Sequence, residues 1–213
     1  EQYEKWRGMK FELHYLPPEE MTADKKYPGW KKKPTKNIDL LKESKTSVNG
    51  LTPDTVKLTG AWVLVDSREK PSWGDNAKYP DDTEIEQAIQ ELRAAGIVAG
   101  DNAKGDRFRI SWEELHNQEV KNKLAEILEV SPDQLRLPRA IEFNFLGNAH
   151  YPKWGETNSW EWLEEAYQAP GQTGSRHLVG GYSAYGGLSR VDWDYPGGRS
   201  DTFGFRPLIV FSS

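Results

Sequence analysis

Cysteine is absent from this chain of 213 residues. Disulfide bonds, thiolate nucleophiles and cysteine-liganded zinc are therefore excluded. The glycine motifs that cradle phosphates or dinucleotides, and the Gly-x-Ser-x-Gly nucleophile motif, are missing as well. The four histidines show no short metal-ligand spacing; they are His14, His116, His150 and His177. The sequence therefore predicts no metal site and no cofactor.

Long apolar runs and a strong excess of one charge are also lacking. No run approaches the ~20 residues that span a bilayer, so we expect no membrane insertion. The chain carries 33 acidic and 28 basic residues, a net charge of −5. A nucleic-acid-binding protein would usually present a basic surface, so we expect no nucleic-acid partner.

Aromatic residues, by contrast, are plentiful. Nine Trp, nine Tyr and seven Phe offset a hydrophobic content of only 36%. Each ring can bury roughly 150–250 Å², so we expect an aromatic-rich core. The length suits a single domain over residues 1–213, in which residues 1–55 form an N-terminal elaboration.

Local patterns predict several elements in the first two thirds of the chain. Residues 10–17 and 56–67 are the strand candidates, and Phe11, Leu13 and Tyr15 alternate with polar positions in the first. One helix is expected from a cap at Thr83 with Glu86 in its capping box, and it ends at Gly96.

Three further helical starts follow in the sequence. A second long helix begins at Ser111, with Glu114 in the capping-box position. A short helix or turn begins at Ser131, where proline follows the cap. The residues 158–167, with Asn158 or Ser159 as the cap, form a predicted short helix.

The segment 180–207 combines many glycines with an unusual number of rings. Linkers rich in glycine do not carry such rings, which here are Tyr182, Tyr185, Trp193, Tyr195, Phe203 and Phe205. Residues 173–213 also contain no Lys, Glu, Gln or Met, although these types are common elsewhere. Strand-and-turn structure disfavours Lys and Glu, and is one explanation of the shift.

Four sequence pieces in order carry a family resemblance. They are "LRLPRAIEF" at 135–143, "NSWEWLEE" at 158–165, "SRHLVGGYS" at 175–183 and "RSDTFGFRP" at 199–207. Over residues 133–211 the chain resembles the formylglycine-generating-enzyme variant of the C-type lectin fold. The resemblance implies an α+β fold with two main helices, a small antiparallel sheet and long loops.

Two kinds of protein carry this variant. One is an oxidase that binds copper through cysteines after its Gly-Gly pair, and this chain, which has none, cannot supply those thiolates. The other is the variable protein of diversity-generating retroelements, in which the segment between Gly-Gly and Gly-Phe-Arg binds ligand and is rewritten by adenine-directed mutagenesis. The resemblance therefore implies a non-enzymatic protein whose variable face covers about 180–202.

Such mutagenesis, acting mostly on Asn codons of the AAY type, cannot produce Lys, Glu, Gln, Met or Trp. Between Tyr182 and Thr202 only Trp193 lies outside the reachable set, so Trp193 is predicted to be constant.

On this basis the sequence divides the segment into two groups of residues. The predicted ligand-binding side chains are Tyr182, Ser183, Ala184, Tyr185, Leu188, Ser189, Asp192, Asp194, Tyr195, Ser200 and Asp201. The predicted structural supports are Gly180, Gly181, Trp193, Phe203, Gly204, Phe205 and Arg206. Phe203, Phe205, Leu208, Val210 and Phe211 are expected to form the inner side of a closing strand.

The expected partner is a protein or a glycan, and the resemblance implies display on a virion or cell surface. The sequence leaves the ligand and the oligomeric state open. Three alternatives remain: a fixed-sequence glycan-binding lectin, a structural surface subunit without a ligand, and a hydrolase. The hydrolase would use the Trp/Glu cluster at 160–165, with a pair such as Glu161 and Glu164.

Overall fold

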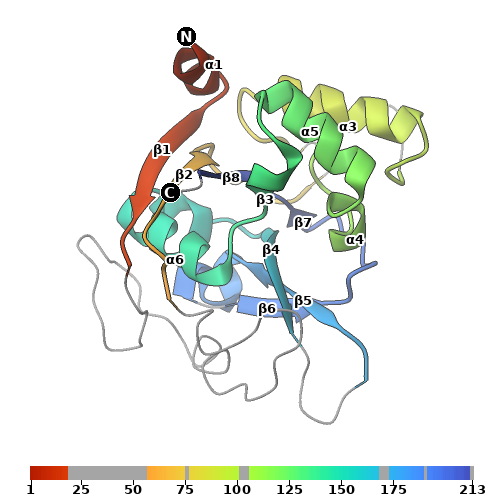
Figure 1. The fold of residues 1–213 in the computed structure, drawn as a ribbon. Coiled ribbons are helices and arrows are strands. Elements are labelled where there is room, and N and C mark those ends of the chain that lie inside the picture. The colour runs from red at the N-terminus through yellow and green to blue at the C-terminus, as the bar shows by residue number, and fades with distance from the viewer. Residues whose placement is uncertain (19–56, 75–76, 101–105, 168–172, 190, 212–213) are drawn as a thin grey trace.

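The computed structural model describes residues 1–18, 57–74, 77–100, 106–167, 173–189 and 191–211, and these form two sheets flanked by helices (Figure 1). The strands are β1 (Phe11–Leu16), β2 (Ala61–Asp66), β3 (Leu135–Arg136), β4 (Trp160–Tyr167), β5 (Arg176–Gly180), β6 (Val191–Asp194), β7 (Phe203–Gly204) and β8 (Leu208–Phe211). The helices are α1 (Gln2–Gly8), α3 (Glu84–Ala94), α4 (Trp112–Leu115), α5 (Gln118–Leu128) and α6 (Ala140–Ala149). Short 3₁₀ turns are η2 (Pro132–Gln134), η3 (Pro152–Gly155), η4 (Ser183–Tyr185) and η5 (Gly187–Ser189).

The two sheets each contain four strands. The first has the order β1-β2-β8-β3 with antiparallel neighbours, and the second has the order β6-β5-β4-β7. In the second sheet β4 pairs with β7 in parallel, whereas its other pairs are antiparallel. The α+β class is confirmed, and the expected small antiparallel sheet is in fact two sheets, one of them mixed.

The strand expected within residues 10–17 is present, but its predicted inner face is wrong. Phe11 is fully buried, whereas Leu13 and Tyr15 are 40% and 47% exposed. β1 is the edge strand of its sheet, and Tyr15 packs across the register on the exposed ring of Trp62, with centroids 5.3 Å apart. A cross-strand aromatic pair thus takes the place of the core at this end of the sheet.

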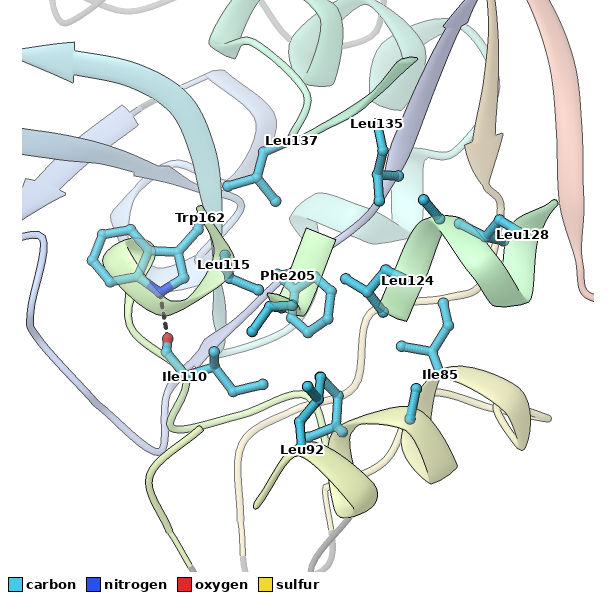
Figure 2. Packing of buried hydrophobic residues seen from close by; sticks show 14 of the residues in the cluster. Ile85, Leu92, Ile110, Leu115, Leu124, Leu128, Leu135, Leu137, Trp162 and Phe205 are labelled. Atoms are coloured by element: carbon cyan, nitrogen blue, oxygen red, sulfur yellow. Dashed lines mark hydrogen bonds between the residues drawn. The ribbon is translucent and has the colours of Figure 1, made fainter. Parts of the chain in front are cut away.

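The first sheet is covered on both of its faces, which produces two hydrophobic clusters. One cluster gathers the apolar sides of α3, α4 and α5 with Phe205 and Ile209. The close-up shows residues of these three helices around Phe205 (Figure 2). The other gathers α6 around Leu208. Because neighbouring residues of β8 enter different clusters, Leu208 and Ile209 are both fully buried, while Val210 and Phe211 are partly exposed. The predicted simple alternation over 208–211 is therefore wrong.

The helix predicted after residue 83 is α3, but its predicted cap does not form. Its stripe of Ile85, Ala88, Ile89 and Leu92 is buried, and Gly96 adopts the left-handed conformation with φ 73°. Thr83 makes no side-chain capping bond; its backbone is already helical and its hydroxyl donates to Glu84 instead.

The next two helical starts are confirmed. Ser111 and Glu114 form a reciprocal capping box, and Ser131 forms one with Gln134. The helix from Ser111 is interrupted, however: α4 ends after Leu115, and α5 restarts behind a new cap at Asn117. No helix in the described ranges is long and apolar enough to cross a membrane.

Residues 160–167 form strand β4, so the predicted helix with a cap at Asn158 or Ser159 is wrong. The helical reading depended on the glutamates, which favour helices in isolation. In the fold this segment lies between β5 and β7 and pairs with both, and Trp160, Glu161 and Trp162 are all buried. Pairing on both edges and burial on both faces overrides the local preference.

Candidate ligand-binding face

The segment that follows β5 is anchored where the chain passes close to its neighbours. Gly181 has φ 95°, and a Cβ there would lie 3.0 Å from the Trp154 carbonyl oxygen and 3.1 Å from the Phe143 ring. Gly187 has φ 58°, and a Cβ there would meet the Gly155 carbonyl oxygen at 2.4 Å. Only glycine fits these two positions, which bracket the turn at Ser183–Tyr185.

The second anchor follows residue 202. Phe203, Gly204, Phe205 and Arg206 are all buried. A Cβ on Gly204 would lie 2.7 Å from the Tyr79 hydroxyl. These residues hold the carboxyl-terminal end of the segment against β4 and the first hydrophobic cluster.

Arg206 carries the densest set of contacts in this anchor. Its guanidinium donates to the backbone carbonyl oxygens of Asp66 and Arg68, and it pairs with Glu161 at 2.8 Å (Nη2 to Oε1). It also lies 3.9 Å from the centroid of the Trp154 ring. The expectation that Arg206 bonds backbone carbonyls is thus confirmed, and the contacts show that it joins β2, β4 and the 68–70 segment.

The ion pairs around Arg206 continue into a buried network. Arg107 pairs with Asp66 at 2.6 Å and with Asp82 at 2.5 Å, and Arg68 pairs with Asp66 at 3.1 Å. Burial alone would raise the pKa of Asp66, but the guanidiniums of Arg107, Arg206 and Arg68 hold it below its usual value. The carboxylate is therefore charged, and its charge is balanced inside the fold.

Between the anchors, the turn at 182–186 faces outward. Ser183, Ala184 and Tyr185 are exposed, Tyr185 to 51%. Tyr182 is half-buried, and its ring lies 5.2 Å from both Trp160 and Tyr185. A buried tryptophan thus supports two tyrosines that reach the surface, and the predicted display role of this turn is geometrically possible.

Leu188 is an exception, and its predicted display role is wrong. It is 3% exposed and belongs to the second hydrophobic cluster. Its side chain fills the space beside Gly147 and Gly155, where an added Cβ would lie 2.4 and 2.7 Å away, and its carbonyl accepts from Asn144. Leu188 is an internal clamp, so only its neighbours can touch a ligand. The side chain of Ser189 lies outside the described residues.

A second exposed group lies along β6. Trp193 and Tyr195 are 39% and 55% exposed, and both rings cover the guanidinium of Arg176, at 4.2 and 4.8 Å. Arg176 also donates to the Tyr195 hydroxyl at 3.0 Å. Trp193, predicted as a structural support, lies at the surface, where it and Tyr195 pack on the same guanidinium. Arg176 lies in the "SRHLVGGYS" piece that carries the family resemblance, but the sequence analysis assigned it no role in the candidate face.

The remaining predicted display residues occupy β6 and the loop after it. Asp192, Asp194 and Ser200 are half-buried, and Asp201 is exposed. The loop is tied to the start of α4, because Arg199 pairs with Glu114 at 3.0 Å and the Arg109 N–H donates to the Ser200 carbonyl.

The predicted face consists of two groups rather than one continuous patch. Tyr182 follows the Gly180 end of β5, whereas Tyr195 lies beyond the other end, where His177 pairs with Asp194. The five residues of β5 span roughly 13–17 Å at the rise of a strand. In the parts of the chain that the structure describes, no aromatic contact joins the two groups.

A solved structure similar to this chain identifies its fold. No family model and no curated protein matches this sequence. The crystal structure of CarF, a protein with a C-type-lectin-like fold, matches with a TM-score of 0.52 and 12% identity, over 96% of this chain and all of that one. The fold is C-type-lectin-like. Treponema denticola variable protein 1 is similar over 72% of this chain and 86% of its own, at 14% identity and a TM-score of 0.44.

In this C-type-lectin-like chain the carboxylates of β4 are bound within the fold. Glu161 pairs with Arg206 and accepts from the Tyr79 hydroxyl at 2.6 Å. Glu164 accepts from the Leu137 backbone N–H, and Glu165 accepts from that of Ala140. A hydrolase at 160–165 would need carboxylates directed at a substrate, whereas these are directed at the scaffold. Among the described residues, no cluster of metal-ligating side chains is assembled either.

Histidines and a tryptophan form a stack beneath the β6 group. The ring of Trp112 lies between His116 at 3.4 Å and His177 at 3.6 Å, and His116 contacts Glu164 at 3.2 Å. Burial, followed by the charge of His116, lowers the pKa of His177 to about 4. Burial also lowers the pKa of His14 to about 4.

The lowered pKa of His177 predicts that the protein is less stable in acid. Between pH ~6.5 and ~4 the unfolded chain binds a proton at His177 that the folded chain does not, so the free energy of unfolding falls as pH falls through this window. We expect the difference in unfolding free energy between pH 7 and pH 5, measured in urea, to narrow in His177→Phe, which keeps a ring against Trp112. Glu165, whose pKa burial raises to about 7, contributes with the opposite sign in both proteins and cancels in the comparison. An unchanged difference would contradict this assignment.

Proposed function

We propose that this chain is a non-enzymatic ligand-recognition protein, the variable protein of a diversity-generating retroelement, which displays a changeable surface on its C-type lectin scaffold. One observation carries the proposal. The turn of Ser183, Ala184 and Tyr185 is exposed, while the residues that bracket it, Gly181 and Leu188, are locked in the interior. A surface that changes identity without unfolding needs this separation of roles.

The composition of the segment supports the proposal independently. From Tyr182 to Thr202 every residue except Trp193 can arise from a randomised AAY codon. Trp193 stacks on Arg176, whose side chain is 6% exposed, so a constant residue at 193 has a structural reason. Leu188 is reachable by such mutagenesis but is buried, so we expect it to be constant as well.

The chemistry of the exposed residues resembles that of an antibody paratope. Tyrosine supplies a large contact area for two rotatable angles, and serine, glycine and alanine let neighbours adapt. The aspartates of β6 and Asp201 favour a partner, protein or glycan, that is basic or rich in hydrogen-bond donors. Display on a virion or cell surface follows from the resemblance.

Sequencing the locus tests the proposal directly. We expect a near-identical copy of the 3′ end of the gene, differing mainly at adenines, beside a reverse transcriptase. We also expect clones of a population to differ at codons 183–185 and not at 188 or 193. Clones that are identical throughout 180–202, with no template copy, would instead indicate a fixed-sequence lectin.

A further inference from the structure

Trp73 is an exposed tryptophan on a segment distant in sequence from the turn at 182–186. It lies on the loop that follows Lys70, and it is 43% exposed. Within the described residues its ring has no aromatic, cation–π or hydrogen-bonding partner. Isolated hydrophobic residues on a surface are common, so the exposure of Trp73 indicates a binding role only if its neighbours do so as well.

Two consecutive residues place Trp73 next to the turn. The Asn158 side-chain oxygen accepts the backbone N–H of Trp73 at 3.1 Å. The Thr157 carbonyl accepts the backbone N–H of Ser183 at 2.8 Å. The two loops are thus bonded to adjacent residues of the segment that leads into β4, so the backbones of Trp73 and Ser183 lie close together.

Hydrogen bonds fix the backbone of the loop that carries Trp73. The Lys70 ammonium donates to the carbonyl and hydroxyl oxygens of Ser159, and the Ser159 hydroxyl donates to the Pro71 carbonyl. A Cβ on Gly181 would meet Lys70 Cε at 3.1 Å, so the Lys70 side chain lies directly beneath the start of the turn. Burial lowers the pKa of Lys70 to about 7. Trp73 is therefore a ring presented from a fixed loop.

We infer that Trp73 is a constant anchor of the ligand-binding surface formed by the turn at 182–186, and that the partner is a protein. The inference rests on the proposed function. Trp73 lies far upstream of 180–202, and no randomised AAY codon yields tryptophan, so this contact stays the same while Ser183, Ala184 and Tyr185 change. A constant ring gives each variant a shared area of contact, and the variable residues supply the discrimination.

The surroundings of the ring favour a protein over a glycan. A sugar site needs polar groups placed beside the ring to bind hydroxyls. Two polar groups of the segment that holds this loop are already used within the fold: the Asn158 oxygen by the Trp73 backbone N–H, and the Ser159 hydroxyl by Lys70 and Pro71. A tryptophan beside tyrosine and small residues is the pattern of a protein–protein hot spot.

A display library of the full chain tests this inference. Ser183, Ala184 and Tyr185 would be randomised with NNY codons, and the library would be selected against purified lysozyme and purified ubiquitin. Each binder would then receive Trp73→Ala, Trp73→Phe or, as a matched control, Trp62→Ala. Trp62 is a tryptophan of similar exposure, 51% against 43%, but it lies on β2 of the first sheet.

We expect Trp73→Ala to weaken the Kd of most binders at least about tenfold. Trp73→Phe should retain most of the affinity, Trp62→Ala should change it less than about twofold, and the melting temperature of Trp73→Ala should match that of its parent. Binders whose affinity does not depend on Trp73 would overturn the anchor and leave the proposed function standing. Binding to immobilised mannan or chitin, with no protein binders, would overturn the protein partner. A library that yields no binder of either kind would count against the proposed function itself.

Discussion

Arg206→Met is expected to destabilise the protein by about 3–5 kcal/mol, because it removes one member of a buried ionic network and leaves its partner uncompensated. Arg206 is fully buried, and it pairs with Glu161 while donating to the backbone carbonyls of Asp66 and Arg68. Methionine matches much of the volume, so the loss reports the charge and the hydrogen bonds. Equilibrium unfolding in urea, at pH 7, measures it.

Lys153→Met is the matched control. Lys153 pairs with Glu69, and both side chains are about 60% exposed, so this ion pair should contribute little to the free energy of unfolding. If the two substitutions lower the free energy of unfolding by the same amount, the network around Arg206 does not hold the carboxyl-terminal anchor.

Phe205→Ala is the second large expected effect, also about 3–5 kcal/mol. Phe205 is 1% exposed and lies in the first hydrophobic cluster, where Leu115 and Leu124 surround its ring (Figure 2). Alanine would leave a cavity that the surrounding side chains can fill only in part. For a chain of this size the melting temperature should fall by roughly 6–20 °C.

Tyr185→Ala provides the contrast for Phe205→Ala. Its ring is more than half exposed, so the free energy of unfolding should change by no more than about 0.5 kcal/mol. Scanning calorimetry of both variants would separate the two roles. A Tyr185→Ala variant as unstable as Phe205→Ala would show that the turn belongs to the core and is not free to vary.

The substitutions at 205 and 206 both test whether residues that flank the exposed turn stabilise the fold. We expect stability to be concentrated in residues that flank the exposed turn, and the turn itself to contribute little to it. The same division explains why Gly181 and Gly187 bracket the turn: a side chain at either position would collide with backbone or ring atoms. In the proposed function, the ligand-binding surface changes while its supports do not.

Local interactions are the part of the structure that the sequence determined. The capping boxes at Ser111 and Ser131 form as predicted from partners three residues apart, whereas the same spacing at Thr83 gives no box because the Thr83 backbone is already helical. The stripe of α3 is buried as its period requires. The α+β class and the lectin-like fold also agree with the order of four short motifs, although no single motif is specific.

Tertiary structure decided the features that depend on contacts between distant segments. Residues 160–167 became a strand because β5 and β7 were available on either side. Leu188 became internal because Gly147 and Gly155 left room for it, and Trp193 became a surface residue because Arg176 lies beneath it. A sequence pattern reflects the local conformational preference of a residue. Whether its side chain is buried depends instead on which distant segment packs against it. The capping boxes at Ser111 and Ser131 could therefore be predicted, and the membership of the candidate ligand-binding face could not.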